Sequence, residues 1–299
     1  MNYLLQKFKK TYLLLILIFF SCEHQHSQID STNQRLFYKI KGAGKPTLVM
    51  LHGLLGSHRY WDGVVPELSR NHELLLMDLL GFGESQKPPI EYTVAQHLVK
   101  IEDVIEHTQL KESQFIVVGH SMGAFLALNY AIAHPNQVRK LVLINAPMNT
   151  DEESLKKAIA ENSSQFMVTM TFSKVWGKLV CHIHELMPWI SYPLIRILEP
   201  ELPPAIAQAA GQHSYASYSG SFTNILLKQK FYDLLDKVPE IPVLIIASSK
   251  DEYSKDLALV MLPQRSNLKV VKIDGNHNVL LSDPDRISKE ILKFIELNY

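Results

Sequence analysis

The sequence predicts an α/β fold, in which a mostly parallel, doubly wound sheet carries helices on both faces. Short runs that are apolar on both faces are typical of strands buried in a parallel sheet. These runs alternate with stretches of helical periodicity along most of the 299 residues. A third observation indicates where the chemistry lies, because the buried-strand pattern in FIVVGHSMGAF (Phe115–Phe125) stops at a serine between two glycines.

The composition is that of an ordinary globular protein. With 46% hydrophobic and 20% charged residues, the chain is able to bury a large core. Thirty basic and thirty acidic side chains cancel, and no basic stripe interleaved with aromatic residues follows the first ten residues, so no nucleic-acid partner is expected. Cys22 and Cys181 are the only cysteines, so no disulfide framework is expected.

The N-terminal segment differs in kind from the rest of the chain. Lys7, Lys9 and Lys10 precede the nine-residue apolar run YLLLILIFF at Tyr12–Phe20. A membrane-spanning helix needs about 20 apolar residues, so this shorter run after a charged region predicts a secretory signal peptide over residues 1–22.

The end of that segment, FFSC, resembles the lipobox of bacterial lipoproteins, in which the cysteine is acylated and becomes the new N-terminus. Phe19 and Phe20 depart from the leucine and the small residue usual there. We expect lipidation of Cys22, with a signal cut elsewhere or kept as an anchor as the alternative. Several acyl chains would hold the protein on a membrane, and the polar residues 23–34 would form a tether.

The core elements then follow in order. The expected strands are Leu36–Ile40, Thr47–Leu51, Leu74–Met77, Phe115–Val118, Leu141–Ile144, Val243–Ile246 and Leu268–Ile273. The helical patterns are Trp61–Leu68, Val94–Thr108, Met122–Ala133 and Asp285–Asn298. These elements assign residues 35–147 and 236–299 to the α/β core.

One insertion interrupts the alternation of strands and helices. Residues 148–235 show helical and loop patterns with proline breakers and no strand signal. We expect a helical cap over the carboxyl edge of the sheet, inserted after the sixth strand in an eight-strand numbering. Its Met, Trp and Phe residues are compatible with an apolar acyl pocket or with a core of the cap itself.

The segment GHSMG at residues 119–123 has the pattern G-x-S-x-G directly between a strand and a helix. This context predicts a nucleophile elbow, a tight turn that lifts a serine hydroxyl to the edge of the sheet. A side chain larger than that of glycine would collide with the neighbouring strand or helix. Ser121 would lie at a helix N-terminus, which favours a developing negative charge, and His120 is expected to point elsewhere.

A serine hydroxyl needs a base and an orienting acid to become a strong nucleophile. Asp251 follows the strand Val243–Ile246, and His277 follows the strand Leu268–Ile273. The chain order Ser121, Asp251, His277 is that of hydrolases with a nucleophile elbow. Loops after strands of an open sheet converge on one site, so these three residues are the predicted catalytic triad.

The acid has alternatives. Asp256 and Asp274 lie near Asp251 in the sequence. Some hydrolases with a nucleophile elbow carry the acid after an earlier strand, which here is the strand that precedes the insertion. That position is occupied here by Asn145, which has no carboxylate. Among 13 histidines, His277 is preferred as the base because it lies in a glycine-containing loop after a late strand.

A second loop, HGLLG at residues 52–56, follows the strand Thr47–Leu51. In elbow-type hydrolases this loop supplies one main-chain N–H of the oxyanion hole, and the residue after the nucleophile supplies the other. The predicted donors are therefore Leu54 and Met122. His52 is expected to be a structural hydrogen-bonding residue rather than a base.

In order and spacing, LHGLLGS, MDLLGFGES, GHSMG, the aspartate after the strand and GNHNVLLSDPD resemble the motifs of α/β-hydrolase fold enzymes, in the capped esterase, lipase and C–C hydrolase group. The resemblance covers residues 35–299. Leu80 stands where arginine is frequent, Ser248 where glycine often opens the acid loop, and Asn276 where glycine usually precedes the histidine. The last two departures can alter the loop geometry around the triad.

The resemblance and the ordered triad predict a serine hydrolase that cleaves carboxyl esters of small to medium apolar acids through an acyl-enzyme. A serine at position 121 argues against haloalkane dehalogenase or epoxide hydrolase chemistry, which uses an aspartate nucleophile. Two alternatives stay open: C–C bond or amide hydrolysis on the same triad, and a slow-turnover small-molecule binding protein.

No cofactor and no metal is expected. The expected partners are a small-molecule ester or related acyl substrate and, through the N-terminal lipid, a membrane. The expected location is the bacterial cell envelope, as an exported and membrane-anchored lipoprotein.

Overall fold

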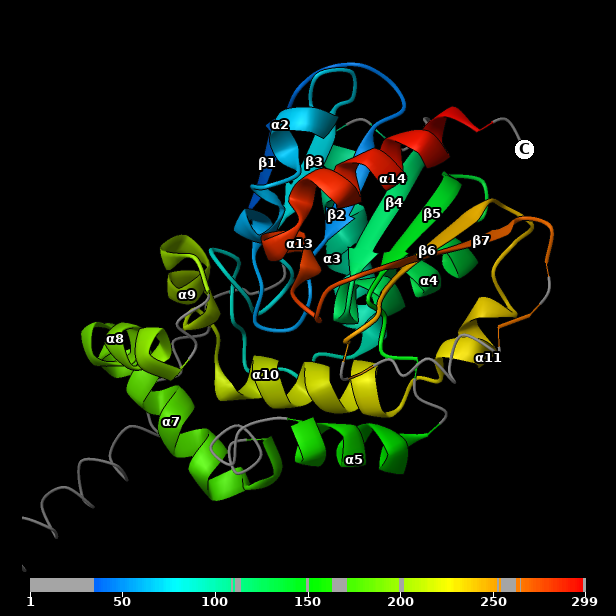
Figure 1. The fold of residues 1–299 in the computed structure, drawn as a ribbon. Helices are drawn as coiled ribbons and strands as arrows, with labels where there is room; N and C mark the ends of the chain where they lie inside the picture. Colours follow the sequence, from blue (N-terminus) through cyan, green and yellow to red (C-terminus); the bar gives the residue numbers. More distant parts are fainter. Residues whose placement is uncertain are drawn as a thin grey trace, which may run out of the picture. The chain divides into compact units, whose positions relative to one another are not determined.

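The computed structural model describes residues 35–108, 110, 114–148, 151–162, 171–198, 202–251, 253, 262–263 and 265–297 (Figure 1). Contacts divide the chain into two units, residues 1–34 and 35–299, and all described residues belong to the second. The signal peptide over residues 1–22, the lipidation of Cys22 and the tether over residues 23–34 lie outside them and stay predictions. Within the described ranges, no helix has both the length and the apolar character needed to cross a membrane.

A seven-stranded sheet forms the centre of this unit, in the order β1-β3-β2-β4-β5-β6-β7. The strands are β1 (Tyr38–Lys41), β2 (Leu48–Leu51), β3 (Leu74–Met77), β4 (Phe115–His120), β5 (Val138–Ile144), β6 (Val243–Ser248) and β7 (Leu268–Ile273). All neighbours are parallel except the edge strand β1, which pairs antiparallel with β3. β2, β3, β4 and β6 are buried along their whole length, as their continuous apolar sequences predict.

Alternate side chains of a strand enter two separate cores. In β2, Val49 and Leu51 belong to one core, whereas Leu48 and Met50 belong to the other. The first core is closed by α3 (Val94–His107), α4 (Met122–Ala133) and α11 (Phe231–Leu235), and the second by η2 (His58–Trp61), α2 (Val65–Leu68), α13 (Val279–Ser282) and α14 (Pro284–Glu296). Helices on both faces confirm the doubly wound arrangement (Figure 1).

The helix expected at Trp61–Leu68 is instead two short helices, η2 and α2. The side chain of Ser57 caps η2, and Pro66 lies in the first turn of α2, where its missing N–H is tolerated. Inside one continuous helix the same proline would remove a backbone hydrogen bond, so the chain makes a turn between the two. α13 has no counterpart among the expected helices.

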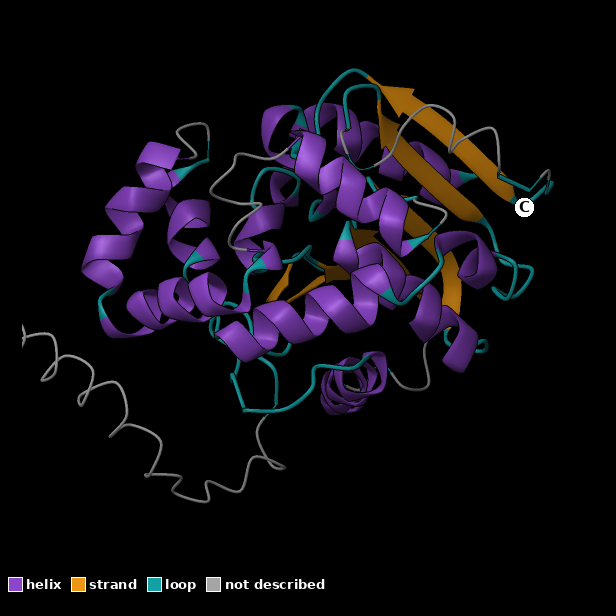
Figure 2. Ribbon diagram, turned by 90° about the horizontal axis from the view of Figure 1, so that it is seen from below, coloured by secondary structure: helices purple, strands orange, loops and turns teal. Residues whose placement is uncertain are grey.

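The regular elements described in the insertion are helical, as expected for the cap. They are α5 (Glu152–Asn162), α7 (Lys174–Leu186), α8 (Pro188–Leu198), α9 (Pro204–Ala210), α10 (Tyr215–Ser221), the π-helix η3 (Phe222–Leu227) and α11. η3 and α11 contact α4. α5 and α10 lie beyond the carboxyl ends of the central strands (Figure 1), and the view from below shows these helices in front of the strands (Figure 2).

The position of the insertion needs one correction in numbering. It follows β5, which is the fifth of seven strands, and precedes β6. The expected insertion after the sixth strand assumed eight strands, and no strand precedes Tyr38 within the described residues.

Candidate active site

Ser121 occupies the sharp turn between β4 and α4, with φ = 54° and ψ = −117°. A positive φ is unusual for a residue with a side chain and marks local strain. Close approach requires both flanking glycines, because a Cβ on Gly119 would lie 2.3 Å from the main-chain oxygen of Gly123, and one on Gly123 would lie 2.1 Å from that of Leu51. The strand, turn and helix of a nucleophile elbow are therefore present.

The structure brings Ser121, His277 and Asp251 together. Nε2 of His277 lies 2.9 Å from Oγ of Ser121, and Nδ1 lies 3.0 Å from Oδ1 of Asp251. A carboxylate accepts hydrogen bonds, so Nδ1 carries the proton and the lone pair of Nε2 faces the serine hydroxyl. This is the mutual geometry that a nucleophile, a base and an orienting acid require.

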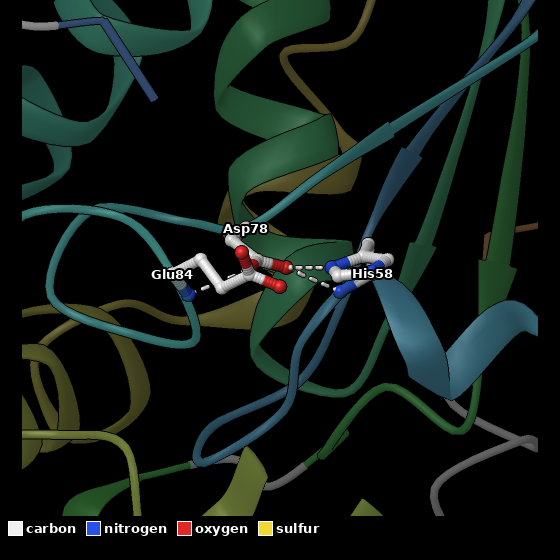
Figure 3. A group of neighbouring side chains, drawn as sticks. All are labelled: His58, Asp78 and Glu84. Atoms are coloured by element: carbon white, nitrogen blue, oxygen red, sulfur yellow. Dashed lines mark hydrogen bonds and ion pairs between the residues drawn. The ribbon is translucent and has the colours of Figure 1, made fainter. Parts of the chain in front are cut away.

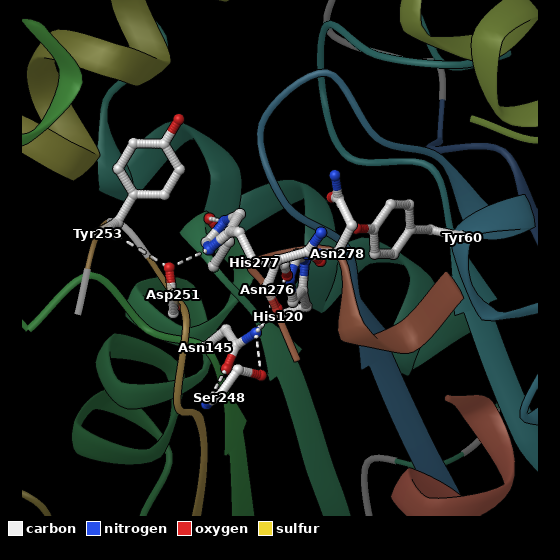
Figure 4. Close-up of polar contacts among 10 residues, drawn as sticks. Tyr60, His120, Asn145, Ser248, Asp251, Tyr253, Asn276, His277 and Asn278 are labelled. Atoms are coloured by element: carbon white, nitrogen blue, oxygen red, sulfur yellow. Dashed lines mark hydrogen bonds and ion pairs between the residues drawn. The ribbon is translucent and has the colours of Figure 1, made fainter. Parts of the chain in front are cut away.

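The acid is fixed by its surroundings. The Asp251 side chain is fully buried, and its Oδ1 also accepts a hydrogen bond of 3.0 Å from the N–H of Tyr253. The ring of Tyr253 stands edge-on to His277, with centroids 4.7 Å apart (Figure 4). Oδ2 has no hydrogen-bond partner among the described residues. Asp251 therefore holds the imidazole through a single oxygen.

The alternative acids are not placed at the imidazole. Asp274 is on the surface, where its carboxylate lies 3.0 Å from Lys250 and accepts a hydrogen bond of 2.8 Å from Ser249. Asp256 lies outside the described residues. Asn145 is buried at the end of β5, and its amide contacts the main chain of the loops around His277 (Figure 4).

The loop after β2 brings Leu54 to the site. His52 joins this loop to the next one, because its Nδ1 donates to the oxygen of Gly53 at 2.7 Å and its Nε2 accepts from the N–H of Leu79 at 2.9 Å. Burial lowers the pKa of His52, which keeps the ring neutral and agrees with the expected structural role. Among the described hydrogen bonds, none is donated by the main-chain N–H of Leu54 or Met122, so both donors are available to a bound oxygen.

A buried aspartate, Asp78, is hydrogen-bonded to His58 at the end of the same loop. Oδ1 of Asp78 accepts from the main-chain N–H and Nδ1 of His58, at 2.5 and 2.7 Å, and Oδ2 accepts from the N–H of Glu84 at 2.7 Å (Figure 3). Burial acts to raise the pKa of Asp78, but the hydrogen bonds from His58 and Glu84 and the nearby His52 outweigh it, and the pKa is lowered. The three side chains offer metal-ligand atoms within 4.8 Å of one another. Both oxygens of Asp78 already accept from N–H groups, so the cluster pins two loops together.

A pocket with a volume of about 170 Å³ opens at Ser121 and His277. Sheet-edge loops and the cap form it together. The lining residues are Leu54, Leu55, Ser121, Pro147, Leu155, Ile159, Thr171, Tyr218, Phe222, Leu226, Tyr253 and His277. The described lining includes no lysine or arginine, and the hydroxyls of Thr171 and Tyr218 pair with each other at 2.7 Å. The pocket is therefore suited to an uncharged, largely apolar group.

The aromatic and sulfur-containing residues of the cap contribute less to this pocket than their number in the sequence suggests. No methionine or tryptophan is among its described lining residues. Trp176 and Trp189 are 56% and 69% exposed, so they belong to the outer surface of α7 and α8. Phe222, in the π-helix, packs in the first core and also lines the pocket. Tyr218 of α10 lines the pocket as well.

Sequence reasoning gives no role to three side chains that contact the His277 loop (Figure 4). The ring of His120 stacks on Tyr60 with centroids 4.9 Å apart, and Tyr60 donates to Oδ1 of Asn278 at 2.5 Å. Asn145 is the third. Neither hydropathy nor spacing singles them out, because their partners lie more than 100 residues away in the chain.

The elbow serine, with a histidine and an aspartate hydrogen-bonded behind it, is the arrangement of a hydrolase, and among the described hydrogen bonds the N–H groups of Leu54 and Met122 stay open to a bound oxygen. The chain belongs to the alpha/beta hydrolase fold family, whose model matches residues 46–284.

Two curated proteins illustrate the similarity. The chain is 36% identical over 137 residues to the probable lysophospholipase BODYGUARD 1 of Arabidopsis thaliana, and 33% identical over 111 residues to 2-hydroxy-6-oxo-6-(2'-aminophenyl)hexa-2,4-dienoic acid hydrolase of Metapseudomonas resinovorans. These matches cover 42% and 36% of this chain but only 29% and 38% of the relatives. Among solved structures, the enol-lactonase from Burkholderia xenovorans LB400 has a TM-score of 0.66 at 17% identity, covering 88% of this chain and 96% of that one. This likeness shows the shared fold.

Proposed function

We propose that this protein is a serine hydrolase that cleaves carboxyl esters of small to medium apolar acids. The observation that carries the proposal is the hydrogen-bonded series from Ser121 through His277 to Asp251, with steps of 2.9 and 3.0 Å, at the base of an apolar pocket. A nucleophile paired with a base, which is paired in turn with an acid, is the arrangement that acyl transfer requires.

Each residue has a defined part in the proposed reaction. Nε2 of His277 removes the proton of Ser121 as Oγ attacks the ester carbonyl carbon, and Asp251 stabilises the imidazolium that forms. The N–H groups of Leu54 and Met122 bind the oxyanion, each contributing about 3 kcal/mol to the transition state. The imidazolium then gives its proton to the leaving alkoxide, and water removes the acyl group from Ser121 by the same steps.

The size of the pocket predicts the preferred acyl group. An apolar cavity of about 150 Å³ holds a benzene ring, and the pocket here has about 170 Å³. We expect kcat/KM in a series of p-nitrophenyl esters from two to sixteen carbons to rise up to butyrate or hexanoate, because each methylene buried in the pocket contributes about 0.8 kcal/mol. At the longest chain we expect a fall of about 10-fold or more, because a sixteen-carbon acid does not fit a cavity of this volume. A flat profile, or an optimum at sixteen carbons, would contradict this assignment.

The wall of the pocket can be tested separately. Leu226 of η3 lines the pocket, so we expect Leu226→Ala to move the optimum toward longer acids by about two to three carbons. Leu235→Ala is the matched control: Leu235 is buried in the same core but does not line the pocket, so that variant should lose stability and keep the original optimum. An equal shift in both variants would mean that general loosening, rather than the pocket wall, sets the preference.

The lining of the pocket and a labelling experiment separate the alternative functions. An acid substrate such as that named for the Metapseudomonas relative would place a carboxylate in a described lining without lysine or arginine, which disfavours it here. A chain that hydrolyses no ester but is labelled at Ser121 by a serine-directed phosphonate would be a hydrolase of C–C or amide bonds. Absence of labelling would favour a binding protein.

A further inference from the structure

We propose that His120 and Asn145 are positioning residues for His277, and that they act by holding its main-chain carbonyl from two sides. The inference rests on the proposed function, since it explains how the base of the triad is kept in place. Neither side chain contacts Ser121 Oγ or lines the pocket, so neither is offered as a catalytic residue.

The loop that carries His277 needs such support. His277 lies between the end of β7 at Ile273 and the start of α13 at Val279, in a segment without regular backbone pairing. The orientation of its ring must satisfy Ser121 and Asp251 together, and a misplacement of about 1 Å in such a geometry lowers the rate by about 100-fold.

The carbonyl of His277 has two donors within 3.0 Å. Nε2 of His120 lies 3.0 Å from this oxygen, and Nδ2 of Asn145 also lies 3.0 Å from it. A carbonyl oxygen has two lone pairs, and both are used. The donors come from different strands: His120 ends β4, directly before Ser121, and Asn145 follows β5. Through His120, the carboxyl end of β4 therefore both carries Ser121 and holds the main chain of His277.

Asn145, which follows β5, connects the end of β6 with the loop that follows β7. Its Oδ1 accepts from the N–H of Ser248 at 2.9 Å, and its Nδ2 lies 2.9 Å from Oγ of Ser248 and 3.1 Å from the oxygen of Asn276. Ser248 ends β6 and leads into the loop of Asp251. Asn145 has φ = 45°, a left-handed conformation that asparagine tolerates better than most residues. Ser248 and Asn276 are two of the three positions where the sequence departs from the hydrolase pattern, and both lie in the loops around the predicted triad.

The surroundings of His120 keep its ring neutral, with a proton on Nε2 that is donated to the carbonyl of His277. Because the carbonyl accepts, Nε2 carries the proton, and Nδ1 is buried without a hydrogen-bond partner among the described residues. Burial, together with the nearby His277, lowers the pKa of His120 well below its usual value. His120 therefore stays neutral while His277, whose ring centroid is 5.1 Å away, accepts the proton of the serine.

The hydrogen bond of His120 can be separated from its packing by two substitutions. His120→Phe keeps a flat ring against Tyr60 but removes the donor, whereas His120→Gln loses the ring and retains an N–H₂ donor. With full-length protein and p-nitrophenyl butyrate, we expect kcat to fall by about 10- to 100-fold in His120→Phe, with KM changed by less than about 3-fold, and most of the loss to be recovered in His120→Gln. An equal fall in both variants would overturn the hydrogen-bond role.

Asn145 is tested by changing the polarity of one atom. Asn145→Asp keeps the shape and the acceptor for Ser248, but it presents an oxygen to the two carbonyls of Asn276 and His277. We expect a fall in kcat of at least the same size, without a matching rise in KM. Asp274→Asn is the control in the same loop, because Asp274 is a surface carboxylate that contacts Lys250 and Ser249, and it should retain activity within about 3-fold. Unchanged kcat in Asn145→Asp, or an equal loss in Asp274→Asn, would contradict the proposal.

A readout that needs no turnover keeps this inference distinct from the proposed function. The proton on Nδ1 of His277, hydrogen-bonded to Asp251, is expected to give a low-field proton NMR signal in the wild type. We expect that signal to broaden or disappear in His120→Phe and Asn145→Asp, while the other proton signals keep the dispersion of a folded protein. Absence of ester hydrolysis with this pattern of signals would reject the proposed esterase but keep the positioning role of His120 and Asn145. A sharp, unshifted signal in both variants would reject that positioning role.

Discussion

Ser121→Ala is expected to lower kcat/KM for p-nitrophenyl butyrate by about 10⁴- to 10⁶-fold, which is the range for removing a triad nucleophile. The oxyanion donors and the pocket remain, and they account for any residual rate above that in water. The fold should persist, because the substitution removes the hydrogen bond between Oγ and His277 but leaves the flanking glycines, on which the turn depends. We expect the free energy of unfolding to change by less than about 1 kcal/mol.

Steady-state kinetics and urea unfolding of the same preparation measure both halves of this expectation. Ser282→Ala is the matched control, since Ser282 is an exposed serine at the end of α13 and should retain full activity. Ester hydrolysis that survives in Ser121→Ala would mean that another nucleophile is responsible, and the proposed function would fall.

The second large effect concerns stability rather than chemistry. Asp78→Ala removes a fully buried carboxylate and leaves the N–H groups of His58 and Glu84 and the ring of His58 without their acceptor. Leaving a buried donor without its acceptor typically costs about 1 to 3 kcal/mol. Because three donors lose their acceptor, we expect a loss of at least about 3 kcal/mol in urea unfolding at pH 7. Because the same carboxylate holds the loop of Leu54, kcat should fall in the fraction that remains folded.

The pH dependence gives this prediction a sign. The pKa of Asp78 is lower in the folded protein than its ordinary value, so the carboxylate contributes stability above the unfolded pKa of about 3.9. That contribution is lost as the pH falls through the lower folded value. Comparison of wild type with Asp78→Asn should therefore show a gap in unfolding free energy that is full at pH 7 and shrinks below about pH 4. A gap of constant size down to pH 3 would attribute the effect to packing instead.

The elbow could be predicted from five consecutive residues because its chemistry is local. Glycine at 119 and 123 allows a strand to turn into a helix within one residue, and no other part of the chain is needed to infer this. The order of Asp251 and His277 after later strands could be inferred from periodicity, since parallel strands deliver their following loops to one edge. Their roles in catalysis stay predictions until the variants are measured.

The helix expected at Trp61–Leu68 shows where local periodicity is insufficient. An apolar pattern continues across that segment, but Ser57 and Pro66 each favour a helix start, and the two starts divide the segment. The expected strand numbering also depended on the family pattern rather than on residues within this chain, so it did not transfer to the seven described strands.

By itself, therefore, the sequence determined the α/β fold, the elbow, both loops of the candidate oxyanion hole and the order of the predicted triad, because each depends on neighbours in the chain. Only the tertiary structure decided that Asn145, considered as an empty acid position, is a donor to the loop of the base, and that His120 faces His277. It alone set the volume of the pocket and left Trp176 and Trp189 on the outer surface. These features depend on contacts between residues far apart in the chain, and side-chain geometry of that kind leaves no periodic signal in a single sequence.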